Sequence, residues 1–241
     1  MRSALNKHLE DLLARQRALQ SAQDRQGAFG ARLRELCLWQ TERLAHTYAD
    51  LRRHPRYEHA IEFFLNDLYG PRDFAQRDEE LARAWRYLKR TLPSPTLRAL
   101  RQAIELQILT RELDGEMASV LAPGAVTVDT YAAAYRAVGR HRARLRQIAL
   151  ILGVGEQLDR LCRHAWLEVA LRVAHRPAHA AGFGVLQDFL ERGFEAFGRM
   201  GGAEVLLRTI RERETGVLRA LFAGRGAALD IEALRASPGN A

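Results

Sequence analysis

A chain of 241 residues with 47% hydrophobic residues can bury a core as one large domain or two small ones. No apolar run approaches the roughly 20 residues of a membrane span. The charged N-terminus lacks the apolar core of a signal peptide, so we expect a cytoplasmic protein. The net charge of +8 comes almost wholly from arginine, with 35 Arg against 2 Lys, and it permits anionic partners.

The sequence reads as a succession of helices whose boundaries are marked by prolines and glycines. Helices are expected over residues 4–25, 31–53, 56–69, 74–92, 95–121, 129–152, 156–174, 178–199 and 203–223. We therefore predict an all-α fold, a compact multi-helix bundle of about eight to nine helices. Residues 1–226 are expected to form a single helical domain, with any sub-boundary near 123–128. Residues 227–241 are expected to form a partly disordered C-terminal tail.

The first expected helix carries one leucine seam, formed by Leu5, Leu9, Leu12 and Leu19. Gln16 interrupts the seam where a coiled coil would place an apolar residue. We therefore expect the seam to be covered mainly within the chain, by the second helix. A homodimer through this seam is the secondary alternative.

The stretch 63–78 stops one helix and starts the next with dedicated residues. Gly70 and Pro71 favour a helix end. Asp73, with Gln76 three residues later, has the spacing of a capping box. The simplest interpretation of this corner is a set of ion pairs that lock the turn, and the alternative is a ligand or partner site. Its candidate residues are Asp67, Tyr69, Arg72, Asp73, Arg77 and Asp78.

The same stretch carries the motif FFLxDLYGPxDFxxRD, and it is preceded by Trp39-Gln40, Thr47-Tyr48-x-Asp50-Leu51 and Arg56-Tyr57. With these residues the chain resembles a family of uncharacterised, mostly proteobacterial helical proteins. The resemblance covers roughly residues 37–121. It implies a helical fold, and it carries no known activity, cofactor or catalytic residue to this chain.

Three carboxylates, Glu105, Glu112 and Glu116, fall within an arc of about 40° on the fifth expected helix. Apolar residues flank this acidic stripe on both sides, which makes the three residues candidates for metal ligation or acid–base chemistry. A salt-bridged stripe is the simpler interpretation, because Arg101 lies one turn before Glu105.

We expect no intrinsic metal and no cofactor. The chain contains no Glu-x-x-His, which a ferritin-like di-metal site would use. His175 and His179 have metal-like spacing, but Pro177 between them is expected to break the helix that would align the two rings. Sequence motifs for a serine nucleophile, a P-loop or a dinucleotide-binding fold are also missing, so the sequence leaves open whether the chain is an enzyme.

The sixth expected helix has no Asp or Glu from Thr130 to Gly155, and Arg136, Arg140 and Arg144 share an arc of about 80°. These arginines are candidates to face an anion, a partner protein or the acidic stripe of the preceding helix. The face offers no interleaved aromatic residues for base stacking, which disfavours nucleic acid.

Three functional hypotheses follow. The first is a non-enzymatic protein–protein interaction module with an unidentified protein partner. The second is a helical enzyme, or a ligand- or metal-binding protein, with a polar pocket near Glu105, Glu112 and the 67–78 corner. The third, ranked below both, is a nucleic-acid-associated protein that uses the Arg-rich helix 130–152.

Overall fold

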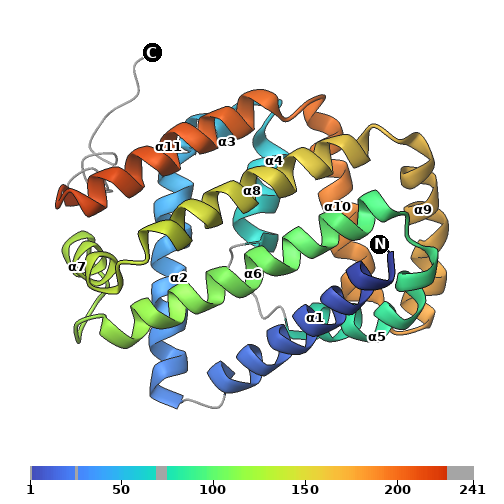
Figure 1. Ribbon diagram of the computed structural model, residues 1–241. Helices are drawn as coiled ribbons and strands as arrows, with labels where there is room; N and C mark the ends of the chain where they lie inside the picture. Colours follow the sequence, from blue (N-terminus) through green and yellow to red (C-terminus); the bar gives the residue numbers. More distant parts are fainter. Residues whose placement is uncertain (1, 25–26, 69–74, 227–241) are drawn as a thin grey trace.

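The structure is a computed structural model that describes residues 2–24, 27–68 and 75–226, and its fold is all-α (Figure 1). In chain order the helices are α1 (Arg2–Asp24), α2 (Gly27–Thr47), α3 (Ala49–Arg52), α4 (Glu58–Phe63), a π-helical turn η1 (Phe64–Leu68), α5 (Ala75–Thr91), α6 (Ser94–Val120), α7 (Val128–Val138), α8 (His141–Cys162), α9 (Ala165–Ala180), α10 (Gly184–Met200) and α11 (Glu204–Phe222). The expected tail 227–241 lies outside the described residues.

The described residues contain eleven α-helices, so the expected number of eight to nine is wrong. Three expected helices are divided, and one of them, 156–174, separates at Arg163 and His164 into the end of α8 and the start of α9. The stretch 31–53 separates at Tyr48 into α2 and α3, and the stretch 129–152 separates into α7 and α8. At the break between α7 and α8, Gly139 and Arg140 both have positive φ, 66° and 54°, a conformation that ends a helix. After this break α8 continues through Gly153, where we expected a helix end.

Helix α6 lies at the centre of the molecule and packs against α1, α2, α7 and α8 (Figure 1). The leucine seam of α1 faces α5 and α6, where Leu9 and Leu13 are buried with Trp85 and Ile104. The seam is therefore covered within the chain, but mainly by α6 rather than by the second helix. The interrupting Gln16 is also buried, and its amide donates to Gln107 of α6 at 2.9 Å.

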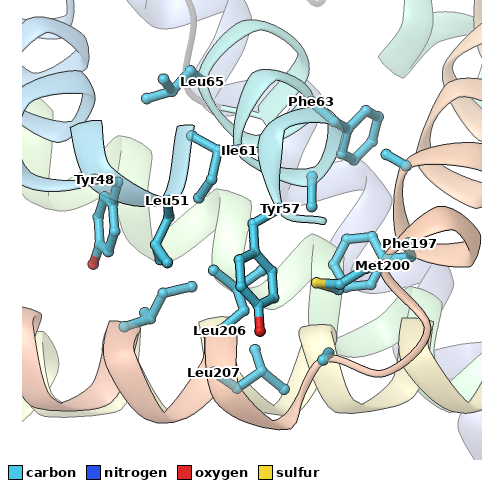
Figure 2. Close-up of a cluster of buried hydrophobic side chains, with 14 of the residues drawn as sticks. Tyr48, Leu51, Tyr57, Ile61, Phe63, Leu65, Phe197, Met200, Leu206 and Leu207 are labelled. Atoms are coloured by element: carbon cyan, nitrogen blue, oxygen red, sulfur yellow. The ribbon is translucent and has the colours of Figure 1, made fainter. Parts of the chain in front are cut away.

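The largest apolar cluster joins α3 and α4 to α10 and α11 (Figure 2). Tyr57, Ile61 and Phe63 point into it from α4, and Phe197 and Met200 close it from α10. Because its members from α3 and α4 are more than 100 residues from those of α10 and α11, the cluster joins the first third of the chain to its C-terminal helices. Within the described ranges, no helix combines the length and apolarity of a membrane span.

Candidate functional site

The charged corner is joined to two distant helices through its two described aspartates. The buried Asp67 carboxylate accepts from Arg192 of α10 at 2.7 and 3.1 Å. The buried Asp78 carboxylate accepts from Arg77 at 3.0 Å, from Gln107 of α6 at 2.7 Å and from Arg111 at 3.2 Å. Both carboxylate oxygens of Asp78 therefore have hydrogen-bond donors. Buried polar groups that are satisfied in this way are typical of a structural contact.

Three candidates of the corner, Tyr69, Arg72 and the proposed N-cap Asp73, lie outside the described residues. A neighbouring carboxylate that sequence reasoning missed, Glu80, is almost fully buried. Glu80 accepts from Gln76 at 3.1 Å and from the backbone N–H of Leu186 at 2.8 Å. It therefore satisfies a free donor in the first turn of α10, where a negative charge is favourable.

The acidic stripe of α6 is divided among separate partners. Glu105 accepts from Arg101 at 2.5 Å and contacts His8 of α1 at 3.3 Å. Glu112 pairs with Arg15 of α1. Glu116 pairs with Arg140 at 2.7 Å. Among the described residues, the three carboxylates have separate partners and do not converge on one point.

The three arginines expected on one basic face have different surroundings, because the break at residues 139–140 changes their direction. Arg136 is exposed on α7, and Arg140 precedes α8 and reaches Glu116 of the acidic stripe. Arg144 points inward and is only 4% exposed. A continuous free basic face is therefore absent from this part of the described chain.

Arg144 is part of a buried polar cavity of about 50 Å³ between α2, α6, α7, α8 and α11. Polar side chains from all five helices face it, and apolar residues of α8 and α11 complete the wall. The polar lining consists of Gln40, Arg43, Asp114, Tyr131, Tyr135, Arg144, Gln147 and Glu214.

One side of the cavity is formed by a salt bridge between Arg43 and Glu214. Arg43 Nη1 donates to both carboxylate oxygens of Glu214, at 2.7 and 3.0 Å, and the Tyr48 hydroxyl donates to the same carboxylate at 2.9 Å. Burial alone would lower the pKa of Arg43, but the Glu214 carboxylate overcomes that effect and raises it. Arg43 therefore stays charged in the wall of the cavity.

The other side of the cavity holds a cation whose donors are largely free. Arg144 Nη1 reaches Gln147 Oε1 at 3.5 Å, and its guanidinium group lies over the Tyr135 ring at 4.5 Å. Among the residues that the structure describes, no acceptor is within hydrogen-bond reach of Arg144 Nε or Nη2, or of Arg43 Nε. Buried charged groups without partners are costly, so these donors mark a place for an acceptor.

Asp114 is the second carboxylate of the cavity, and it accepts a hydrogen bond from Gln40 Nε2 at 3.0 Å. Burial raises the pKa of Asp114, while the nearby Arg144 charge and the Gln40 hydrogen bond partly offset this effect. Burial likewise raises the pKa of Tyr135, so its ring is a neutral surface under the guanidinium group. When Asp114 is protonated, the cavity carries one uncompensated positive charge.

Sequence reasoning named Arg144 but placed it on the surface, and it missed Arg43, Asp114 and Glu214. One signal was present. Gln40 and Arg43 fall between Leu36 and Leu44 in the apolar phase of α2, and Asp114 lies one turn before Met117 in that of α6. A charged residue at a position that faces the core indicates a buried polar site.

The expectation that Pro177 breaks the helix between His175 and His179 is wrong. Helix α9 continues through Pro177, and the rings of His175 and His179 lie 4.5 Å apart. Pro177 lacks a backbone N–H, but it lies near the end of α9. The missing hydrogen bond therefore affects only the last turn of the helix.

The fold and the cavity define an all-helical protein with an internal polar site. The chain belongs to the family described as Domain of unknown function (DUF8198), which matches residues 18–228. This match supports the resemblance to an uncharacterised family and extends it over most of the chain. No curated protein and no solved structure matches the chain.

Proposed function

We propose that the chain binds a small carboxylic acid in the cavity beside Arg144. The observation that carries this proposal is the free Nε–Nη2 edge of a guanidinium group that is 4% exposed. This edge presents two parallel donors, which is the geometry that holds a carboxylate through two hydrogen bonds. The setting we propose is the cytoplasm of a bacterium, as the composition and the family resemblance indicate.

The surroundings of Arg144 favour a bound anion of small size. Gln147 and the Tyr135 ring fix the plane of the guanidinium group, so the donors are oriented before a ligand arrives. Arg43 Nε supplies a further donor. A volume of about 50 Å³ has room for about three to five water molecules at roughly 10–15 Å³ each, which is also the scale of formate or acetate.

Asp114 gives the proposed site a pH dependence. An ionised Asp114 competes with a bound carboxylate for Arg144 and repels it, whereas a protonated Asp114 does neither. We therefore expect tighter binding as the pH falls through the raised pKa of Asp114.

Thermal unfolding in sodium acetate, compared with sodium chloride at the same ionic strength, tests this function. For a dissociation constant on the order of 1 mM, ~100 mM acetate adds about 2.7 kcal/mol. In a chain of this size that corresponds to an increase in Tm of about 5–11 °C. Arg144→Gln should abolish the increase, and Arg142→Gln, which changes an exposed arginine of the same helix, should retain it.

Two outcomes would contradict the proposal. Equal Tm values in acetate and chloride would mean that water alone satisfies the cavity. An increase that persists in Arg144→Gln would place the acetate site elsewhere on this basic protein.

A second candidate function is the protein-interaction module that the sequence favours, and the outer face of α9 supports it. No described residue of α9 is buried, yet Trp166, Val169 and Val173 are 54%, 56% and 71% exposed. Their spacing places them on one side of the helix, and α9 itself lies at the edge of the molecule (Figure 1). Arg176 borders this apolar stripe, and Arg172 beside it pairs with Glu168 of the same helix. The matching partner is therefore a helix with an apolar face and an acidic residue at its flank.

A photo-crosslinking amino acid at position 173 tests this second function in living cells. The expected product is one discrete adduct to an acidic amphipathic segment, lost on Trp166→Glu. The same label at Tyr87, an exposed aromatic residue on α5, is the control and should give no adduct. Adducts only between two copies of this chain, or equal labelling from both positions, would contradict it.

A further inference from the structure

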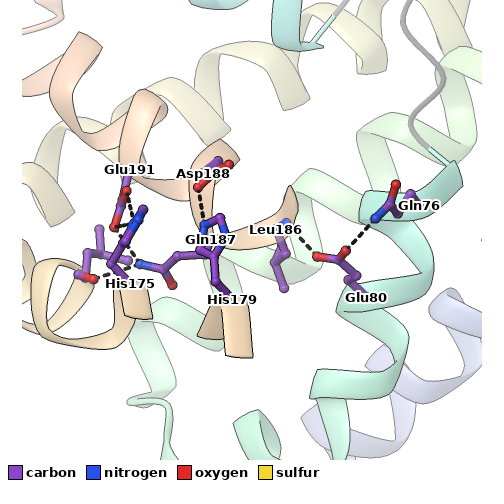
Figure 3. A network of polar contacts seen from close by, with 9 residues as sticks. Gln76, Glu80, His175, His179, Leu186, Gln187, Asp188 and Glu191 are labelled. Atoms are coloured by element: carbon purple, nitrogen blue, oxygen red, sulfur yellow. Dashed lines mark hydrogen bonds and ion pairs between the residues drawn. The ribbon is translucent and has the colours of Figure 1, made fainter. Parts of the chain in front are cut away.

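The hairpin of α9 and α10 gathers two histidines and two carboxylates at its exposed end (Figure 3). His175 and His179 are one turn apart on α9, and Asp188 and Glu191 are one turn apart on α10. His179 Nε2 lies 2.7 Å from Asp188 Oδ1, and His175 Nδ1 lies 2.9 Å from Glu191 Oε2. The four side chains therefore face one another across the hairpin.

The distances bring three of these residues within range of one ion. One ligand atom from each of His175, His179 and Asp188 lies within 4.8 Å of the other two. In a tetrahedral zinc site with bonds of about 2.0–2.1 Å, ligand atoms are about 3.4 Å apart. Closing the remaining gap requires about 1.4 Å at most, which rotation of these partly exposed side chains supplies.

Neighbouring residues hold this cluster in place. Gln187 is buried and donates to Glu191 Oε1 at 2.9 Å and to the backbone carbonyl of Leu171 at 2.7 Å. Gly184 leaves room for the His179 ring, because a Cβ at this position would lie 2.8 Å from Nδ1. These contacts position both the carboxylate and the imidazole before any ion arrives.

We propose that His175, His179 and Asp188 bind a divalent transition-metal ion of the Zn²⁺ class, independently of the cavity at Arg144. Two imidazole nitrogens and one carboxylate oxygen are donors that suit zinc, and a water molecule would complete the coordination. Glu191 is a positioning residue. Through its contact with Nδ1 of His175 at 2.9 Å it would orient that ring, as carboxylates do behind metal-bound histidines.

The ion would act as a clip between α9 and α10. Since none of the described α9 residues is buried, this helix gains little from apolar burial, and a bond across the hairpin would hold it against α10. The clip would also fix the outer apolar stripe of α9 relative to the rest of the molecule.

Calorimetric titration of the chelator-treated full chain with zinc chloride tests the site. We expect one ion per chain and a rise in Tm on saturation. Glu191→Gln should weaken binding about 10–100-fold, the usual effect of removing such a support. His175→Gln and His179→Gln should weaken it further, and His164→Gln, at the other end of α9, should leave it unchanged.

The absorption spectrum of bound cobalt(II) provides a second measurement, which distinguishes loss of a metal ligand from unfolding of the helices. Bound Co²⁺ should show the visible absorption of a four- or five-coordinate ion, and His179→Gln should remove that spectrum while leaving the helical circular dichroism intact. Absence of saturable zinc binding would overturn the proposal, as would equal affinity in His179→Gln. Weakening by His164→Gln as large as that by His179→Gln would do the same.

Discussion

The buried ion pair at the cavity, Arg43–Glu214, should contribute far more to stability than the exposed pair beside it. Arg43 is 8% exposed and makes two hydrogen bonds to Glu214, which also accepts from Tyr48. Arg43→Met leaves the Glu214 carboxylate, which is 14% exposed, without its counter-charge. Removing one partner of a buried pair costs about 3–5 kcal/mol. For a chain of this length we therefore expect Tm to fall by about 6–20 °C.

The adjacent residue of α11 supplies a matched control. Arg213 donates to both carboxylate oxygens of Asp50 at 2.7 Å, but the two side chains are 33% and 55% exposed. Exposed pairs contribute about 0.2–1 kcal/mol, so Asp50→Asn should change the free energy of unfolding by no more than that. Urea unfolding of both variants decides between the two values.

The double variant Arg43→Met/Glu214→Leu separates burial from simple loss of a contact. Replacing both partners of a buried pair by apolar residues is often neutral or stabilising, so the double variant should be more stable than Arg43→Met alone. Equal costs for Arg43→Met and Asp50→Asn would refute this reasoning, because burial would then not determine the strength of the pair.

Three further predictions concern stability. Burial raises the pKa of Asp114 above 3.8, so between that pH and the raised pKa the folded state binds more protons than the unfolded state. The wild type should therefore lose stability as pH rises through this window, and urea unfolding of Asp114→Asn should show a flatter pH profile. In Gly193→Ala the new Cβ would lie 2.8 Å from Phe63 Cζ, which should cost about 1–3 kcal/mol. Gly198→Ala, which meets nothing within 4 Å on the same helix, should gain up to about 1 kcal/mol. Leu9→Ala should cost about 2–5 kcal/mol at every protein concentration, because Leu9 is 0% exposed and covered within the chain, and a cost that varies with concentration would indicate a dimer instead.

The sequence could predict those helices whose ends are marked by residues close to them in the chain. The expected ranges 74–92 and 95–121 correspond to α5 at Ala75–Thr91 and α6 at Ser94–Val120, where prolines and an apolar period mark the ends. The break at Gly139 and Arg140 could not be predicted in this way. A glycine inside a helical pattern is usually tolerated, and the turn here depends on contacts such as Arg140–Glu116 with another helix.

The cavity was beyond prediction for a related reason. Its central contact joins Arg43 and Glu214, which are 171 residues apart, and a single sequence gives no information about which distant helices meet. The sequence does show that Arg43 and Asp114 occupy helix positions that face the core. Arg144 was placed on the surface because the break before α8 rotates it away from the expected face of Arg136 and Arg140.

Saturation-transfer NMR of acetate in the presence of the full chain tests the proposed carboxylate site most directly. We predict transfer from protein to the acetate methyl protons that increases as the pH falls through the raised pKa of Asp114. It should be retained in Arg142→Gln and lost in Arg144→Gln. Transfer that is absent from the wild type, or equal in the wild type and Arg144→Gln, would contradict the assignment of Arg144 as the binding group.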